Sequence, residues 1–131
     1  MTDWDWGRIV FDHVKLTVGD PEASKAFYRT VLGSLGIPPL WESEHGGQYA
    51  NLVVAGPGEP STPVHIGFVA RTREEVDDFH RVGIDAGYAD NGAPGVREQY
   101  SSEAAGLYYA AFLLDPDGNN IEAVHRGEYP A

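Results

Sequence analysis

The clearest pattern of hydrophobic and polar positions in the chain is the alternation in residues 11–18, FDHVKLTV. Successive side chains of a β-strand point to opposite faces, so Leu16 and Val18 share one face while His13 and Lys15 share the other. The segment therefore predicts a strand with one apolar face and a histidine on the opposite face.

The same pattern recurs further along the chain. Residues 11–32 align with residues 63–84 at an offset of 52 positions, which places His13 on His65. Self-similarity of this kind indicates a duplicated structural unit. We expect each copy to begin with a strand and to continue into a helix.

Both predicted helices carry matching start and stop signals. Asp20 precedes Pro21 at the start of the first helix, and Thr72 with Glu75 forms a capping box at the start of the second. Apolar residues then recur at helical spacing, at Ala23, Phe27, Val31 and Leu35 and at Val76, Phe79, Val82 and Ala86. We expect each helix to stop at a glycine, at positions 36 and 87.

The remaining segments predict strands and turns. Expected strands lie at residues 39–43, 48–55, 96–100, 107–114 and 120–126, and the DPDGN sequence forms a turn between the last two. The pattern is βαβββ repeated twice, which predicts an α+β fold with mixed sheets. The predicted organisation is a single domain over residues 1–131, with a first module at 9–55, a linker at 56–63 and a second module at 64–126.

Charge and composition narrow the classes of function. The chain has 9 basic and 20 acidic side chains and a formal net charge of −11, so it would repel nucleic acid and anionic membranes. It lacks a long apolar segment and a basic, apolar leader, which argues against a membrane anchor or a signal peptide. Cysteine is absent, which is compatible with a cytoplasmic location.

Strand parity brings three candidate ligands to one side of the sheets. If the helices cover the face of Leu16 and Ile66, then His13, His65 and Glu122 all project from the opposite face. Neutral imidazole and carboxylate groups suit a divalent ion such as Fe, Mn, Ni, Co or Zn, and three protein ligands leave positions open for substrate. A structural role for each histidine is the alternative.

The doubled βαβββ plan and the segments FDHVKLTV, PVHIGF and DPDGNNIEAV resemble the vicinal oxygen chelate superfamily, which includes glyoxalase I, extradiol dioxygenases and bleomycin-binding proteins. The resemblance covers about residues 9–126. It implies a cup-shaped mixed sheet with helices on the outer face, and it makes His13, His65 and Glu122 the metal ligands. Glyoxalase I usually takes a further carboxylate from the last strand of the first module. That strand, YANLVVAG, has none here, so the ligand set looks more like that of a dioxygenase or a fosfomycin transferase.

This resemblance implies a metal-dependent lyase or dioxygenase that acts on a small oxygenated substrate, and it favours a homodimer. Arg97 and Tyr100 are candidates for orienting the substrate, and Tyr108, Tyr109 and Phe112 are candidates for lining the pocket, although each also suits a structural role. The alternative function is a non-enzymatic module, like the bleomycin resistance proteins, that sequesters a cationic drug-like ligand.

Overall fold

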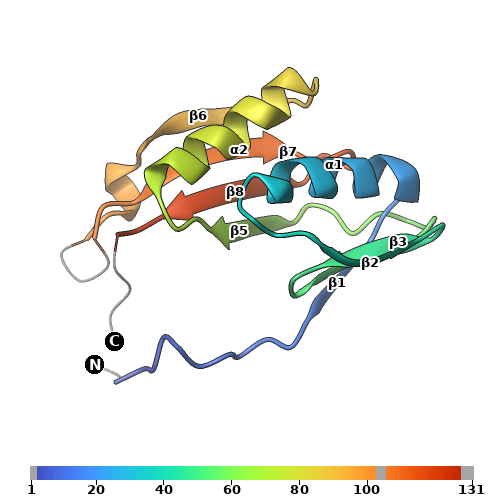
Figure 1. Cartoon of the computed structure of the whole chain (residues 1–131), viewed down its shortest axis with the longest axis horizontal. Helices are drawn as coiled ribbons and strands as arrows, with labels where there is room; N and C mark the ends of the chain where they lie inside the picture. Colours follow the sequence, from blue (N-terminus) through green and yellow to red (C-terminus); the bar gives the residue numbers. More distant parts are fainter. Residues whose placement is uncertain (1–2, 103–105, 128–131) are drawn as a thin grey trace.

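The chain folds into two four-stranded mixed sheets, each with one helix packed against it (Figure 1). The computed structural model describes residues 3–102 and 106–127. The strand orders are β1-β4-β3-β2 and β5-β8-β7-β6, so the second sheet repeats the topology of the first. The predicted α+β fold with two βαβββ units is confirmed.

The elements of the first unit are β1 (Val14–Thr17), α1 (Pro21–Gly33), β2 (Pro39–Ser43), β3 (Gly46–Tyr49) and β4 (Leu52–Ala55). Strand β1 is parallel to β4, whereas the other neighbours are antiparallel. Strand β1 is hydrogen-bonded to one neighbour and forms an edge of its sheet.

The elements of the second unit are β5 (His65–Val69), α2 (Arg73–Asp85), β6 (Asp90–Val96), a 3₁₀ turn η1 (Glu98–Tyr100), β7 (Tyr109–Leu114) and β8 (Asn120–His125). Strand β5 is the edge strand here and runs parallel to β8, as β1 does to β4.

The predicted helix starts are confirmed. The side chain of Asp20 accepts hydrogen bonds from the backbone N–H groups of Glu22 and Ala23, and Thr72 accepts one from Glu75. These bonds satisfy N–H groups that have no partner within the helix. The cap residue of each unit therefore fixes where its helix begins.

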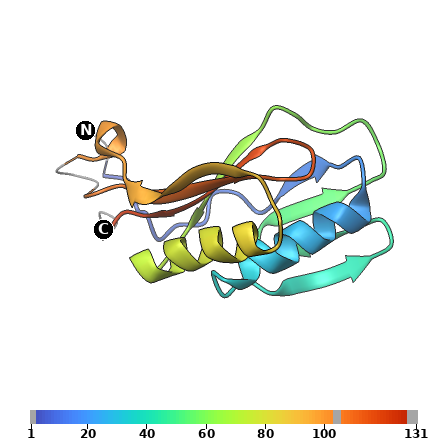
Figure 2. The same ribbon diagram turned by 90° about the horizontal axis from the view of Figure 1, so that it is seen from above.

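The two helices contact each other and share one apolar core. In Figure 2 they are displaced along the horizontal, with their near ends overlapping. Phe27 of α1 and Phe79 of α2 are both fully buried in it. A buried hydrogen bond from the Tyr28 hydroxyl to Asp115, at 2.6 Å, also links α1 to the turn between β7 and β8. Burial and the neighbouring carboxylate raise the pKa of Tyr28, so its hydroxyl stays protonated and donates. Within the described residues, no helix combines the length and apolar character needed to cross a membrane.

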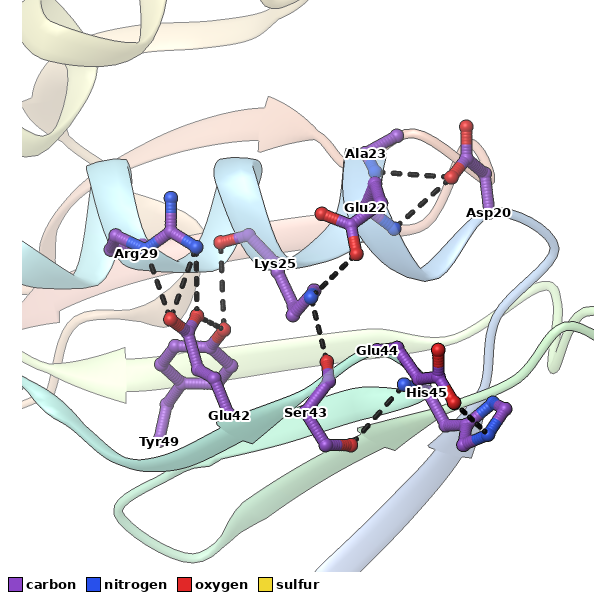
Figure 3. A network of polar contacts seen from close by, with 10 residues as sticks. All are labelled: Asp20, Glu22, Ala23, Lys25, Arg29, Glu42, Ser43, Glu44, His45 and Tyr49. Carbon is purple, nitrogen blue, oxygen red and sulfur yellow. Dashed lines mark hydrogen bonds and ion pairs between the residues drawn. The ribbon is translucent and has the colours of Figure 1, made fainter.

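A polar network fastens the β2–β3 hairpin to α1 (Figure 3). The buried Lys25 ammonium donates to Glu22 and to the backbone carbonyl of Ser43, each at 2.6 Å. Arg29 donates to both carboxylate oxygens of Glu42, at 3.0 and 3.1 Å. These contacts hold the hairpin against α1. The helix covers one face of the first sheet and leaves the opposite face open.

Two strand predictions were wrong in detail. The segment expected as one strand at 48–55 is divided into β3 and β4 by a turn in which Ala50 has a φ of 51°. The strand expected at 96–100 lies earlier, at Asp90–Val96, and residues 98–100 form the 3₁₀ turn. Irregular pairing with β7 allows the glycine-rich segment to act as an edge strand.

Candidate functional site

The helix-free face of the second sheet gathers the candidate chemistry. In the strand register Gly67 of β5 pairs with Glu122 of β8, which pairs with Phe112 of β7. Side chains in register project from the same face, so His65, two residues from Gly67, lies on this face as well. The neighbouring residues Ile121 and Ala123 point the other way, into the helix-covered core. Strand parity had predicted this arrangement.

His65 and Glu122 meet on this face. Nε2 of His65 lies 2.7 Å from Oε1 of Glu122. The Glu122 side chain is 2% exposed, whereas the His65 side chain is 55% exposed. The pair therefore consists of a buried carboxylate that holds an imidazole open to a ligand.

Tyr108 completes the environment of Glu122. Its hydroxyl donates a short hydrogen bond to Oε2, the oxygen that His65 does not contact. Burial and the bond to Glu122 raise the pKa of Tyr108, so the hydroxyl remains a proton donor at neutral pH. Both carboxylate oxygens are thus satisfied, as a buried carboxylate requires.

Gly67 leaves the space beside the pair open. A Cβ atom at this position would already lie 3.4 Å from Oε1 of Glu122. A longer side chain there would cover the carboxylate and the imidazole. The glycine in β5 therefore gives a ligand access to them.

Arg97 and Tyr100, the residues predicted to orient a substrate, lie near this face. The Arg97 guanidinium sits over the ring of Phe112, 5.3 Å from its centroid, and the Phe112 ring is 6.2 Å from that of His65. The Tyr100 ring lies 5.1 Å from the Tyr108 ring.

Tyr109 lies on the other face of the sheet. Its hydroxyl donates to Asp77 of α2 at 2.6 Å, and its ring carries the guanidinium of Arg73. Tyr109 therefore packs against the helix, whereas Tyr108, which was also expected to line the pocket, faces the open side. The segment LYYAAFLL is apolar throughout, so alternation could not tell which tyrosine faces the site. The register relative to Glu122 was the signal that distinguishes them.

The structure does not bring His13 to His65 and Glu122 within one chain. His13 is exposed just before β1, and its Nδ1 lies 2.7 Å from Asp12. Across residues 3–102 and 106–127, no group of three or more His, Cys, Asp or Glu side chains is arranged to hold a metal. One chain thus brings together two of the three predicted ligands, His65 and Glu122. An imidazole nitrogen and a carboxylate oxygen are suitable donors for a divalent ion. Two donors are too few for such a site, however, so a third protein ligand is needed.

Comparisons with known proteins agree on the family. A model of the Glyoxalase/Bleomycin resistance protein/Dioxygenase superfamily matches residues 10–123. A glyoxalase/bleomycin resistance protein from Albidiferax ferrireducens is 38% identical, with a TM-score of 0.71, over 88% of this chain and 98% of that chain. No curated protein matches the chain.

More distant structures share the fold. A lactoylglutathione lyase from Agrobacterium tumefaciens is 17% identical, with a TM-score of 0.63, over 88% of this chain and 92% of that one. A family enzyme from Burkholderia phytofirmans is 22% identical, with a TM-score of 0.63, over 88% and 98% of the two chains. Together with the family model and the repeated βαβββ topology, these likenesses lead to one conclusion: the chain belongs to the glyoxalase/bleomycin resistance protein/dioxygenase superfamily.

Proposed function

We propose that this protein is a metal-dependent lyase or dioxygenase that binds a small substrate through two neighbouring oxygen atoms. The observation that carries the proposal is the His65–Glu122 pair, whose donor atoms lie 2.7 Å apart on the open face of the second sheet. An imidazole nitrogen and a carboxylate oxygen are ligands suited to Fe, Mn, Ni, Co or Zn. A bound divalent ion would supply Lewis-acid chemistry or, as iron, oxygen chemistry.

The third ligand in this proposal is the partner subunit's His13, in a homodimer. His13 corresponds to His65 in the internal repeat and stands exposed at the edge of the first sheet. A symmetric dimer that sets the first sheet of one chain beside the second sheet of the other would join it to His65 and Glu122. Such a dimer would contain two equivalent sites.

The N-terminal segment supports an interface in this region. Ile9, Val10 and Phe11 are 79%, 60% and 70% exposed in a single chain. Adjacent exposed apolar side chains of this size mark interaction surfaces in soluble proteins. They immediately precede His13, so an interface that covers them would also position that histidine.

The chain's own residues have definite tasks in the proposed site. Tyr108 holds Oε2 of Glu122 and turns Oε1 toward His65. Residues that orient a ligating carboxylate in this way tune a metal site strongly. Phe112 forms an apolar wall beside His65, which would orient a planar substrate and exclude water.

The test is a titration of protein purified without a histidine tag or chelator. We expect a divalent metal to copurify with the protein. We also expect catechol to bind the metal-containing protein far more tightly than it binds protein stripped with EDTA. Chelator-insensitive binding of a cationic aromatic compound, together with no affinity for catechol, would favour the sequestering module and contradict the enzyme. Isothermal titration calorimetry and elemental analysis give both results from one preparation.

A further inference from the structure

A bulge in strand β6 contains an asparagine that is followed by a glycine. Asp90 pairs with Leu113 and Gly92 pairs with Phe112, so Asn91 is left without a partner on β7. Strand β6 forms an edge of the second sheet, and Asn91 is exposed. The bulge therefore presents the Asn91 carboxamide to water.

The position after Asn91 requires a glycine. Gly92 has a φ of 153°, which residues with a side chain rarely adopt, and a Cβ atom there would lie 2.8 Å from Cδ1 of Phe112. Because Gly92 has no side chain, nothing of its own crowds its backbone nitrogen. This nitrogen is the nearest nucleophile along the chain to the Asn91 carboxamide.

A carboxylate lies against the same nitrogen. Oδ1 of Asp90 accepts a hydrogen bond from the Gly92 N–H at 2.9 Å, and it also lies 2.9 Å from Nε2 of His80 on α2. These two bonds hold the pKa of Asp90 below its ordinary value, so its carboxylate is charged at neutral pH. Asp90 is thus placed to accept the proton that the Gly92 nitrogen must lose before it can attack.

We infer that Asn91 is a site of spontaneous deamidation in the folded protein, with Asp90 as the proton acceptor. The Gly92 nitrogen forms a bond to Cγ of Asn91, and the bond from Cγ to Nδ2 breaks. The proton from Gly92 passes through Asp90 to the departing nitrogen, which leaves as ammonia. Water then opens the cyclic imide at either of its carbonyl groups, which yields aspartate or isoaspartate at position 91.

The other asparagines of the chain, Asn51, Asn119 and Asn120, lack this arrangement, since each precedes a residue with a side chain. Nδ2 of Asn51 donates to two backbone carbonyls, at 3.2 and 2.7 Å. Asn119 is 2% exposed, and its Nδ2 donates to the carbonyl of Ser61 at 2.9 Å. These three residues serve as controls within the same molecule.

The modification alters the strand that holds Arg97. The Arg97 guanidinium donates to the backbone carbonyls of Ala93 and Gly95, at 2.6 and 2.9 Å, and lies over Phe112. Isoaspartate lengthens the backbone by one methylene group at position 91, so β6 can no longer keep its pairing on both sides of the bulge. The isoaspartate form should therefore exchange its β6 amide hydrogens faster than the unmodified form.

The experiment follows the purified protein at neutral pH and physiological temperature over several weeks. Peptide mapping by mass spectrometry measures the conversion of each asparagine, and enzymatic methylation of isoaspartyl groups identifies the product. We expect the peptide that contains Asn91 to convert to a mixture of aspartate and isoaspartate, while the peptides that contain Asn51, Asn119 and Asn120 stay intact.

Two variants and a control test the chemistry. Asn91→Gln should stop the conversion, because its longer side chain closes the corresponding imide far more slowly. Asp90→Ala should slow the conversion of Asn91 at least about tenfold, as expected for the loss of a positioned proton acceptor. Asp78→Ala removes an exposed carboxylate of α2 that pairs with Arg81, and it should leave the rate unchanged. Circular dichroism confirms that each variant is folded.

The sign of the Asp90→Ala effect separates chemistry from simple anchoring. If Asp90 only held the bulge rigid, its loss would free Asn91 to reach the geometry of the imide, and the conversion would speed up. An equal or faster rate in Asp90→Ala would therefore overturn the role of Asp90. Survival of the Asn91 amide in the folded protein, while the same residue converts in protein unfolded by urea, would overturn the assignment of the site itself.

Discussion

The helix-free faces of the two sheets have the same framework and different chemistry. In the first sheet Lys15 pairs with Val53, at the positions where Gly67 pairs with Glu122 in the second. The first sheet thus carries a long side chain opposite a valine where the second sheet has an open position beside a carboxylate. His13 and His65 remain equivalent.

The helix-covered faces have stayed much more alike. Both helices begin at a side-chain cap, and Phe27 and Phe79 occupy matching buried positions in the shared core. The comparison indicates that core packing kept similar residues on the helix-covered face of each unit. The helix-free faces, which do not pack against a helix, carry different residues. In the proposed dimer the first unit contributes one metal ligand, His13, and the second unit contributes the other two, His65 and Glu122.

The largest effect should come from the equivalent core phenylalanines. Phe27→Ala and Phe79→Ala should each lower the free energy of unfolding by about 3–5 kcal/mol, because each removes a fully buried ring and leaves a cavity. Urea denaturation of the two variants measures the losses. If one variant were nearly neutral, the two helix-covered faces would not be energetically equivalent.

The next test addresses the difference between the last strands of the two units. Glu122→Ala should weaken metal binding by at least about 100-fold, since orienting residues alone account for 10- to 100-fold changes. Val53→Ala makes a comparable change at the equivalent position of the first sheet and should leave metal affinity unaltered. Competition with a chromogenic chelator measures both affinities. If Glu122→Ala and Val53→Ala changed the metal affinity equally, the proposed difference between the two sheets would be wrong.

A third test concerns the hydrogen bond that joins the units. Tyr28→Phe leaves the buried Asp115 without the Tyr28 hydroxyl, and we expect it to cost about 1.5–3 kcal/mol of unfolding free energy. The control is Tyr100→Phe, which removes the hydroxyl of a tyrosine that is 55% exposed and should leave the unfolding free energy nearly unchanged. Thermal denaturation distinguishes them, and an unchanged melting temperature for Tyr28→Phe would show that this bond does not stabilise the link between units.

Sequence patterns predicted the features that follow from a regular spacing of residues along the chain. The repeat around His13 and His65, the caps at Asp20 and Thr72, and the meeting of His65 with Glu122 all follow from periodicity and parity. The turn at Ala50 could not be predicted, because alanine seldom adopts a positive φ and no local signal marks it.

Other misses concern residues at strand ends. The sequence patterns offered both Tyr108 and Tyr109 for the pocket and could not choose between them, because a segment buried on both faces has no alternation to read. The position of His13 relative to His65 depends on how whole sheets pack, which local patterns do not encode.

The smallest expected effect concerns the first unit's hairpin. The Tyr49 hydroxyl, 2.5 Å from Glu42, and the Arg29 guanidinium hold the pKa of Glu42 below its ordinary value of 4.5. A lowered carboxyl pKa stabilises the fold above the ordinary value, and this contribution disappears as the pH falls through the folded-state pKa.

Glu42→Gln should therefore be less stable than the unmodified protein by under about 1 kcal/mol at pH 7, because the group is partly solvated. The difference should shrink below pH 4.5. Urea denaturation at both pH values tests this, and a difference that grows on acidification would contradict the assigned cause.

The central claim is that the metal site joins the second unit of one chain to the first unit of its partner. The most direct measurement is the metal content after His13→Ala and Glu122→Ala variants are unfolded, mixed in equal amounts and refolded together. Neither variant alone should retain metal. Mixed dimers should contain one intact site, so the refolded mixture should recover about a quarter of the metal bound by the unmodified protein. Recovery of no metal from the mixture, while unmodified protein treated in the same way regains its full content, would contradict a site shared between subunits.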